Sequence, residues 1–121
     1  MCEKSSLAKN STWLTYKYPA RKLVRNRLDY YNQFYQFKVS RISIRNQRTR
    51  WGSCSAKGNL NFNYRIVLLP EKLADYIIVH ELCHLKEFNH SADFWALVAQ
   101  ALPDFRQSRS ELKKIKLNSL C

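Results

Sequence analysis

The chain has 121 residues, 45% of them hydrophobic and 25% charged, which suffices to bury one core and excludes a disordered chain. Its two glycines exclude a glycine-rich phosphate loop, and no apolar run is long enough to span a membrane. The net charge is +12, and residues 1–70 carry the whole excess with 14 Lys and Arg against 2 Asp and Glu, while residues 71–121 hold 7 of each.

The first predicted element is a basic helix. Residues 1–17 are polar and weakly patterned, so we expect a frayed start. Pro19 suits a first helical turn, and hydrophobic residues then recur at three- and four-residue spacings, which predicts a helix over residues 19–35. These residues are Leu23, Val24, Leu28, Tyr31, Phe34 and Tyr35.

Three short strands are predicted next. Residues 37–45 mostly alternate hydrophobic and polar, with a slip at 40–41 that indicates a bulge or bend. Residues 49–54 predict a second strand, and residues 60–64 a third one after a turn. Because the strands are short and adjacent in sequence, we predict an antiparallel meander.

Three helices are predicted in the C-terminal half. The first begins near Glu71 and ends near Asn89, which tolerates a left-handed cap, and it is hydrophobic around so much of its girth that it should be buried. Ser91 can cap a second helix that runs to about residue 102. A basic amphipathic helix over residues 104–118 follows.

Residues 80–84 read His-Glu-Leu-Cys-His, which predicts a metal site. On a helix His80 and His84 lie one turn apart on one face, so both imidazoles can bind one ion. Glu81 lies ~100° around the axis, where it can accept a proton from a metal-bound water rather than bind the metal. His90 can supply a third nitrogen after the helix ends, which leaves a fourth position open for water, as in catalytic zinc sites.

Alternatives for this site stay open at the level of sequence. If His90 does not bind the metal, a later helix can deliver a carboxylate as the third ligand, from Asp93, Asp104 or Glu111. The group that stabilises the oxyanion could be Asn63, Tyr64 or Arg65, near the end of the third strand. Cys83 lies on the opposite side of the helix from the site, and we expect it to be packed rather than reactive.

The order of these motifs resembles the YgjP-like family of metal-dependent hydrolases, which are minimal metallopeptidases related to gluzincins and to SprT-like domains. The matching stretches are Arg50-Trp51-Gly52-Ser53-Cys54-Ser55, Gly58-Asn59-Leu60-Asn61-Phe62-Asn63, Leu68-Leu69-Pro70, His80-Glu81-Leu82-Cys83-His84-Leu85, Asn89-His90-Ser91 and Phe94-Trp95. The resemblance implies an α+β fold with a small antiparallel sheet of three to four strands on the HExxH helix and further helices beside it.

The resemblance also implies roles for particular residues. Zinc would be bound by His80, His84 and His90, with Glu81 as the general base. An edge strand would hold an extended peptide, and residues 59–63 are the candidate, with Asn61, Asn63 and Arg65 as the substrate contacts. Trp51 would fill the core, and Gly52 would permit a bulge or close approach.

We therefore predict a single zinc metallopeptidase-like domain over residues 1–121 that cleaves peptides or proteins in the cytoplasm, without a membrane partner. The alternatives are a zinc-dependent nucleotide pyrophosphohydrolase, a nucleic-acid-associated metalloprotease that uses the basic N-terminal part as a polyanion site, or a structural zinc domain. The four cysteines form no CxxC pair, which indicates free thiols. A further hypothesis is that Cys121 folds over the cleft and suppresses activity.

Overall fold

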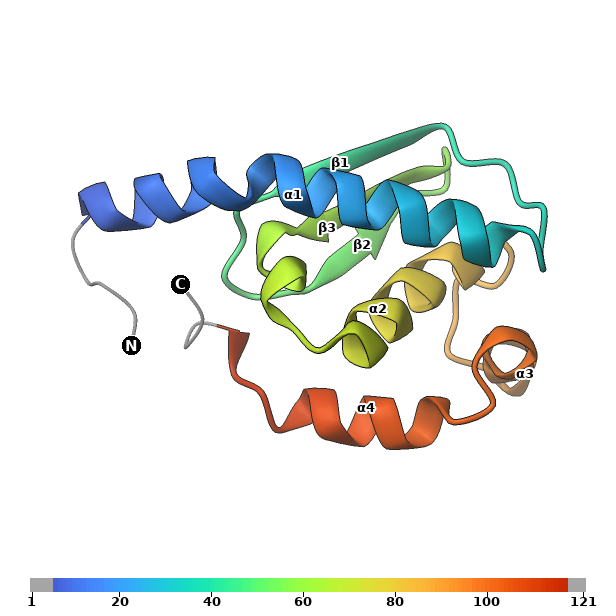
Figure 1. Cartoon of the computed structure of the whole chain (residues 1–121). Helices are drawn as coiled ribbons and strands as arrows, with labels where there is room; N and C mark the ends of the chain where they lie inside the picture. The colour runs from blue at the N-terminus through green and yellow to red at the C-terminus, as the bar shows by residue number, and fades with distance from the viewer. Residues whose placement is uncertain (1–5, 118–121) are drawn as a thin grey trace.

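The computed structural model describes residues 6–117 of the chain, and Cys121 lies outside this range. The elements are the helix α1, three strands, a short 3-10 helix η1 and three further helices, which confirms the predicted α+β class (Figure 1). Their bounds are α1 Ser6–Asn32, β1 Arg41–Arg45, β2 Gly52–Cys54, β3 Asn59–Asn63, η1 Tyr64–Leu68, α2 Glu71–Cys83, α3 Ala92–Ala101 and α4 Phe105–Lys113.

The predicted antiparallel meander is wrong, because the sheet is mixed and its order is β1-β3-β2. β3 runs parallel to β1 and antiparallel to β2. The loop over residues 46–51 causes this order, since it passes the end of β3 and is held there. The side-chain amide of Asn63 donates to the carbonyls of Gln47 and Arg50, and the guanidinium of Arg65 donates to the Gln47 carbonyl (2.9 Å).

α1 begins at Ser6 rather than near Pro19, so Ser6–Lys17 are helical and only residues 1–5 of the expected frayed start lie outside the described range. Pro19 cannot donate a backbone hydrogen bond, which weakens a helix interior. Tertiary packing offsets this cost, since Trp13 meets Tyr64 edge to face at 5.3 Å, six residues before the proline. The helix ends at Asn32, whose side chain clamps the backbone N–H and carbonyl of Phe37.

α2 is the central helix, as its composition predicts, and it packs against α1, α3, α4 and β2 (Figure 1). Ile78, Val79, Leu82 and Cys83 have no exposed surface, which confirms that Cys83 is packed. The helix ends at Cys83 instead of near Asn89. Asn89 has no left-handed backbone, because Gln36 is the only non-glycine residue with positive φ in the described range.

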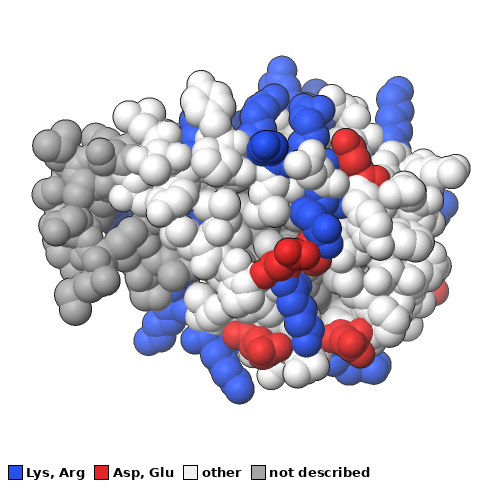
Figure 2. Space-filling model, viewed as in Figure 1, with Lys and Arg blue, Asp and Glu red and all other residues white. Residues whose placement is uncertain are grey.

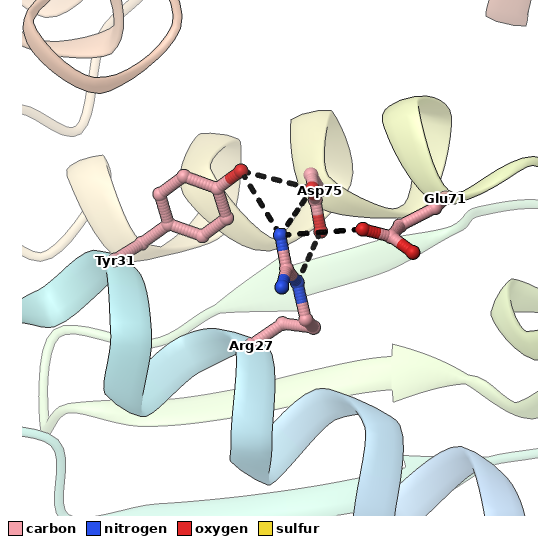
Figure 3. Close-up of polar contacts among 4 residues, drawn as sticks. All are labelled: Arg27, Tyr31, Glu71 and Asp75. Atoms are coloured by element: carbon pink, nitrogen blue, oxygen red, sulfur yellow. Dashed lines mark hydrogen bonds and ion pairs between the residues drawn. The ribbon is translucent and has the colours of Figure 1, made fainter.

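A partly buried ionic cluster ties α1 to α2 (Figure 3). Arg27 donates from Nε and Nη2 to the two carboxylate oxygens of Asp75, at 2.9 and 2.7 Å. The hydroxyl of Tyr31 donates to the same carboxylate at 2.8 Å, and Glu71 lies 3.6 Å from Arg27. Burial, together with the hydrogen bond to Asp75, raises the pKa of Tyr31 to about 12. The cluster fixes α2, and with it the residues on its other face.

The last two helices follow the sequence prediction closely. The hydroxyl of Ser91 accepts from the backbone N–H of Phe94 at 3.4 Å and caps α3, as predicted. α4 ends at Lys113, before the predicted residue 118, and a turn and a short 3-10 stretch follow. Within residues 6–117, no helix combines the length and hydrophobicity needed to cross a bilayer.

Candidate active site

The three histidines of the chain meet at one point. His80 and His84 project from consecutive turns at the end of α2, and His90 comes from the loop before α3. The Nε2 atom of His90 lies 3.2 Å from Nε2 of His80 and 3.0 Å from Nε2 of His84. No other group of three or more potential ligands occurs within residues 6–117, so Asp93, Asp104 and Glu111 do not join the cluster.

The spacing of these nitrogens fits a tetrahedral metal ion. Two nitrogens that each lie 2.0–2.1 Å from a tetrahedral zinc ion are separated by about 3.3 Å. The two shorter separations of 3.0 and 3.2 Å are close to this value, and one ligand atom from each ring lies within 4.8 Å of the others. The three imidazoles can therefore hold one metal ion and leave a fourth position free.

Neighbouring groups orient the ligand rings. The Nδ1–H of His84 donates to the carbonyl of Glu87 at 2.9 Å, which directs its Nε2 atom at the cluster. Phe94 stacks on the ring of His84 with centroids 4.4 Å apart, and Trp95 stacks on His90 at 5.7 Å. The start of α3 thus supplies an aromatic platform behind the ligands.

The environment favours neutral imidazoles, which are the form that binds metal. Burial lowers the pKa of His84, and the neighbouring His80 lowers it further, against an opposing effect of the Glu87 carbonyl. Burial also lowers the pKa of His90, with added repulsion from His80, His84 and Arg109. Both effects favour the unprotonated form of His84 and His90.

Glu81 lies beside the cluster, in contact with β2. Its side chain is 8% exposed, and its Oε2 atom accepts from Nδ1 of His80 at 3.3 Å. A Cβ atom at Gly52 would lie 3.0 Å from Cγ and 3.2 Å from Oε2 of Glu81, and 2.9 Å from the backbone oxygen of Asn61. The predicted close approach at Gly52 is confirmed, because only a residue without a side chain leaves room for Glu81.

A cleft of about 460 Å³ opens beside His80 and Glu81, between β2 and α4. Trp51 is half-buried and lines it, so this residue faces the cleft as well as the core. Tyr76 and Arg109 are among the lining residues that sequence reasoning missed. Tyr76 could have been found, because it lies one helical turn before His80 on the same face of α2. Nothing in the sequence indicates that α4 returns to the site.

The free edge of the sheet at the cleft belongs to β2. The carbonyl of Trp51 accepts from β3 at 2.8 Å, and the N–H of Ser55 donates to β3 at 3.0 Å. Because hydrogen-bonded pairs alternate along an antiparallel ladder, Ser53 also faces β3, and the N–H and C=O groups of Gly52 and Cys54 point outward. An extended chain can bind to these outward groups.

The expected edge strand over residues 59–63 is wrong, because β3 pairs on both sides. The side chains of Asn61, Asn63 and Arg65 do not line the cleft. Asn63 and Arg65 are buried and hold the crossing loop over residues 46–51, and Asn61 bonds to Ser53 at 3.2 Å. The contacts of these three residues therefore support the fold and do not reach the cleft.

Comparison with known proteins agrees with this geometry. No curated protein sequence matches the chain. The fold is similar to the metallopeptidase zymogen abylysin of Pyrococcus abyssi, with a TM-score of 0.68 and 24% identity over 75% of this chain and 92% of that one. It is also similar to the zymogen jannalysin of Methanocaldococcus jannaschii, with a TM-score of 0.61 and 24% identity over 78% of this chain and 94% of that one.

At 24% identity, the two solved structures show the fold of this chain but not its function. The family follows from the sequence, because the model of the YgjP-like metallopeptidase domain matches residues 3–115, which is nearly the whole chain. That span contains all three clustered histidines, Glu81 and every residue of the cleft lining except Leu117. The chain belongs to the YgjP-like family, and its domain is a metallopeptidase domain.

Proposed function

We propose that this protein is a zinc-dependent peptidase that hydrolyses extended peptides with Glu81 as the general base. One observation carries the proposal: three imidazole nitrogens converge within 4.8 Å, next to a carboxylate, beside an open cleft. A structural zinc site has four protein ligands and needs no base, so this arrangement favours catalysis.

In this proposal His80, His84 and His90 hold the ion, which supplies Lewis acidity that acidifies water and polarises the scissile carbonyl. Glu81 accepts the proton of the attacking water at its carboxylate and passes it to the leaving amine. Tyr76 lines the cleft one turn before His80, and burial raises the pKa of its hydroxyl to about 12. Its proton is thus retained, and we assign it the hydrogen bond to the developing oxyanion.

The outward edge of β2 is the proposed peptide-binding strand. The backbone groups of Gly52 and Cys54 can pair with an extended chain, and Trp51 offers a hydrophobic surface beside it. Main-chain pairing suits a peptide and has no counterpart in a nucleoside triphosphate. This edge favours peptide hydrolysis over the alternative phosphoanhydride hydrolysis.

The test is Glu81→Gln in the zinc-loaded full chain. We expect the variant to bind zinc like the wild type and to lose peptide hydrolysis by at least ~10²-fold, as expected for loss of a general base. Lys86→Gln, an exposed residue just after α2, is the matched control and should keep activity. Casein and a panel of nucleoside triphosphates are offered separately. Release of inorganic pyrophosphate without peptide cleavage would reassign the enzyme to phosphoanhydrides.

A second proposal concerns a partner of the basic face over α1 and β1. Figure 2 shows Lys and Arg side chains gathered along the upper edge, above most of the Asp and Glu. Lys17, Arg21 and Arg45 surround a hollow of about 380 Å³ with the exposed ring of Tyr18. Within residues 6–117 no ion pair joins these three side chains to a carboxylate.

We propose that this face binds nucleic acid, whose phosphates suit the charges and whose bases can stack on Tyr18. Binding of a labelled single strand should fall steeply as salt rises, and Lys17→Glu with Arg45→Glu should weaken it at all salt concentrations. Lys86→Glu with Lys114→Glu, at two exposed lysines that do not line this hollow, is the charge-matched control. Weak binding that is insensitive to salt would remove the proposal.

A further inference from the structure

The cleft has a second wall, which α4 supplies. Arg109 and Lys113 lie one helical turn apart on the same face of α4, and both line the cleft together with His80 and Glu81. The guanidinium of Arg109 stacks over the ring of Trp95 at 4.9 Å, and Trp95 in turn stacks on the ligand His90. Arg109 is therefore separated from the metal-ligand cluster by a single aromatic ring.

The positive charge on this wall has no protein counterpart. Glu81 is the only carboxylate that lines the cleft, and it is assigned to the chemistry. Within the described part of the chain neither Arg109 nor Lys113 forms an ion pair, and the carboxylate of Glu111 on the same helix pairs with Lys72 at 3.8 Å. An anionic group of a ligand would meet two uncompensated cations here.

Which ligand can supply that anion depends on how Arg109 and Lys113 lie relative to the edge of β2. Side chains of a peptide paired with β2 alternate in direction, so every second one lies on the same side of the bound strand. A phosphate could also meet the two cations, yet much of the remaining lining is hydrophobic. These hydrophobic residues are Trp51, Ile77, Leu112, Ile115 and Leu117. A hydrophobic cleft beside a strand edge suits a peptide better than a polyphosphate.

We propose that Arg109 and Lys113 form an anion-binding subsite that selects peptides with an Asp or Glu side chain near the scissile bond. The inference rests on the proposed peptidase function and adds its substrate class. Two cations at the surface should favour an acidic over a neutral side chain by about tenfold in kcat/KM, since each partly solvated charge contact adds a few-fold preference. Most of this difference should lie in KM.

The experiment uses the zinc-loaded full chain and peptides that are identical except for one position, which is Glu, Gln or Lys and is moved stepwise along the sequence. At one position we expect the order Glu, Gln, Lys in kcat/KM. Arg109→Glu and Lys113→Glu should each abolish or reverse this order, while Arg109→Lys should keep it. Arg106→Glu is the matched control, because Arg106 is an exposed cation of the same helix that does not line the cleft.

The outcomes are separable. If no peptide is cleaved, the proposed function fails and takes this inference with it. Cleavage of all three peptides at equal rates would overturn the subsite and leave the peptidase intact. Because Arg109→Glu could disturb Trp95 and the metal ligands, zinc affinity is measured for each variant. If Arg109→Glu changes the zinc affinity, the peptide preference of Lys113→Glu alone decides whether the subsite exists. Hydrolysis of nucleoside triphosphates that depends on Lys113 would overturn the acidic-peptide assignment.

Discussion

Substitution of Gly52 by alanine should disable the site without removing its metal ligands. A methyl group at this position would lie 2.9 Å from the backbone oxygen of Asn61 and 3.0 Å from Cγ of Glu81, against ordinary carbon contacts of at least ~3.5 Å. The backbone of a paired strand yields little, so Glu81 must move by roughly half an ångström or more. Displacement on this scale can cost up to ~10²-fold in rate.

We therefore expect Gly52→Ala to lower kcat by about 10² while its zinc affinity stays within about twofold of the wild type. Overpacking should also lower the free energy of unfolding by about 1–3 kcal/mol. Zinc affinity is measured by competition with a fluorescent chelator, kcat with a quenched peptide, and stability in urea.

Gly58→Ala is the matched control for this variant. Gly58 has a φ of +88° in the turn before β3, so alanine is strained there and should cost about 1–3 kcal/mol, yet it lies outside the cleft. Equal losses of kcat in the two variants would show that general destabilisation is responsible. A fully active Gly52→Ala protein would refute the crowding of Glu81.

Four further outcomes are expected. Asp75→Ala removes the bidentate partner of Arg27 and should lower the free energy of unfolding by about 1–3 kcal/mol in a urea titration, since Arg27 is only partly buried. Tyr31 has a folded-state pKa raised from 10 to about 12, so the folded state keeps a proton that the unfolded state loses; stability should fall as the pH rises from 10 to 12, and Tyr31→Phe should flatten this dependence. Removal of zinc with a chelator should lower the melting temperature, since zinc at 100 times its Kd stabilises the folded state by about 2.7 kcal/mol. Asn63→Ala should lower stability by about 1–3 kcal/mol because it removes both hydrogen bonds from Asn63 to the crossing loop and leaves the Arg50 carbonyl without this donor, whereas Asn61→Ala should change it little; a higher KM with unchanged stability in Asn63→Ala would contradict the structural role.

The sequence was sufficient for the parts of the molecule that are local. The three clustered histidines and Glu81 lie within residues 80–90, where helical geometry and one turn bring them together, and the cap at Ser91 follows from the same short-range rules. The start of α1 could not be predicted locally, since the contact between Trp13 and Tyr64 extends that helix through Pro19. The return of α4 to the site depends likewise on tertiary packing.

The order of the sheet determines which strand the substrate can meet. In a meander β2 would be the central strand, with both of its edges paired and no free backbone group near Glu81. The crossing loop carries β2 past β3 instead, so that its unpaired edge borders the cleft. Asn63 and Arg65 hold that loop from the end of β3. The sequence predicted that these two residues touch the substrate. In the structure they hold the crossing loop, and in the proposed function this contact keeps the edge of β2 open for a peptide.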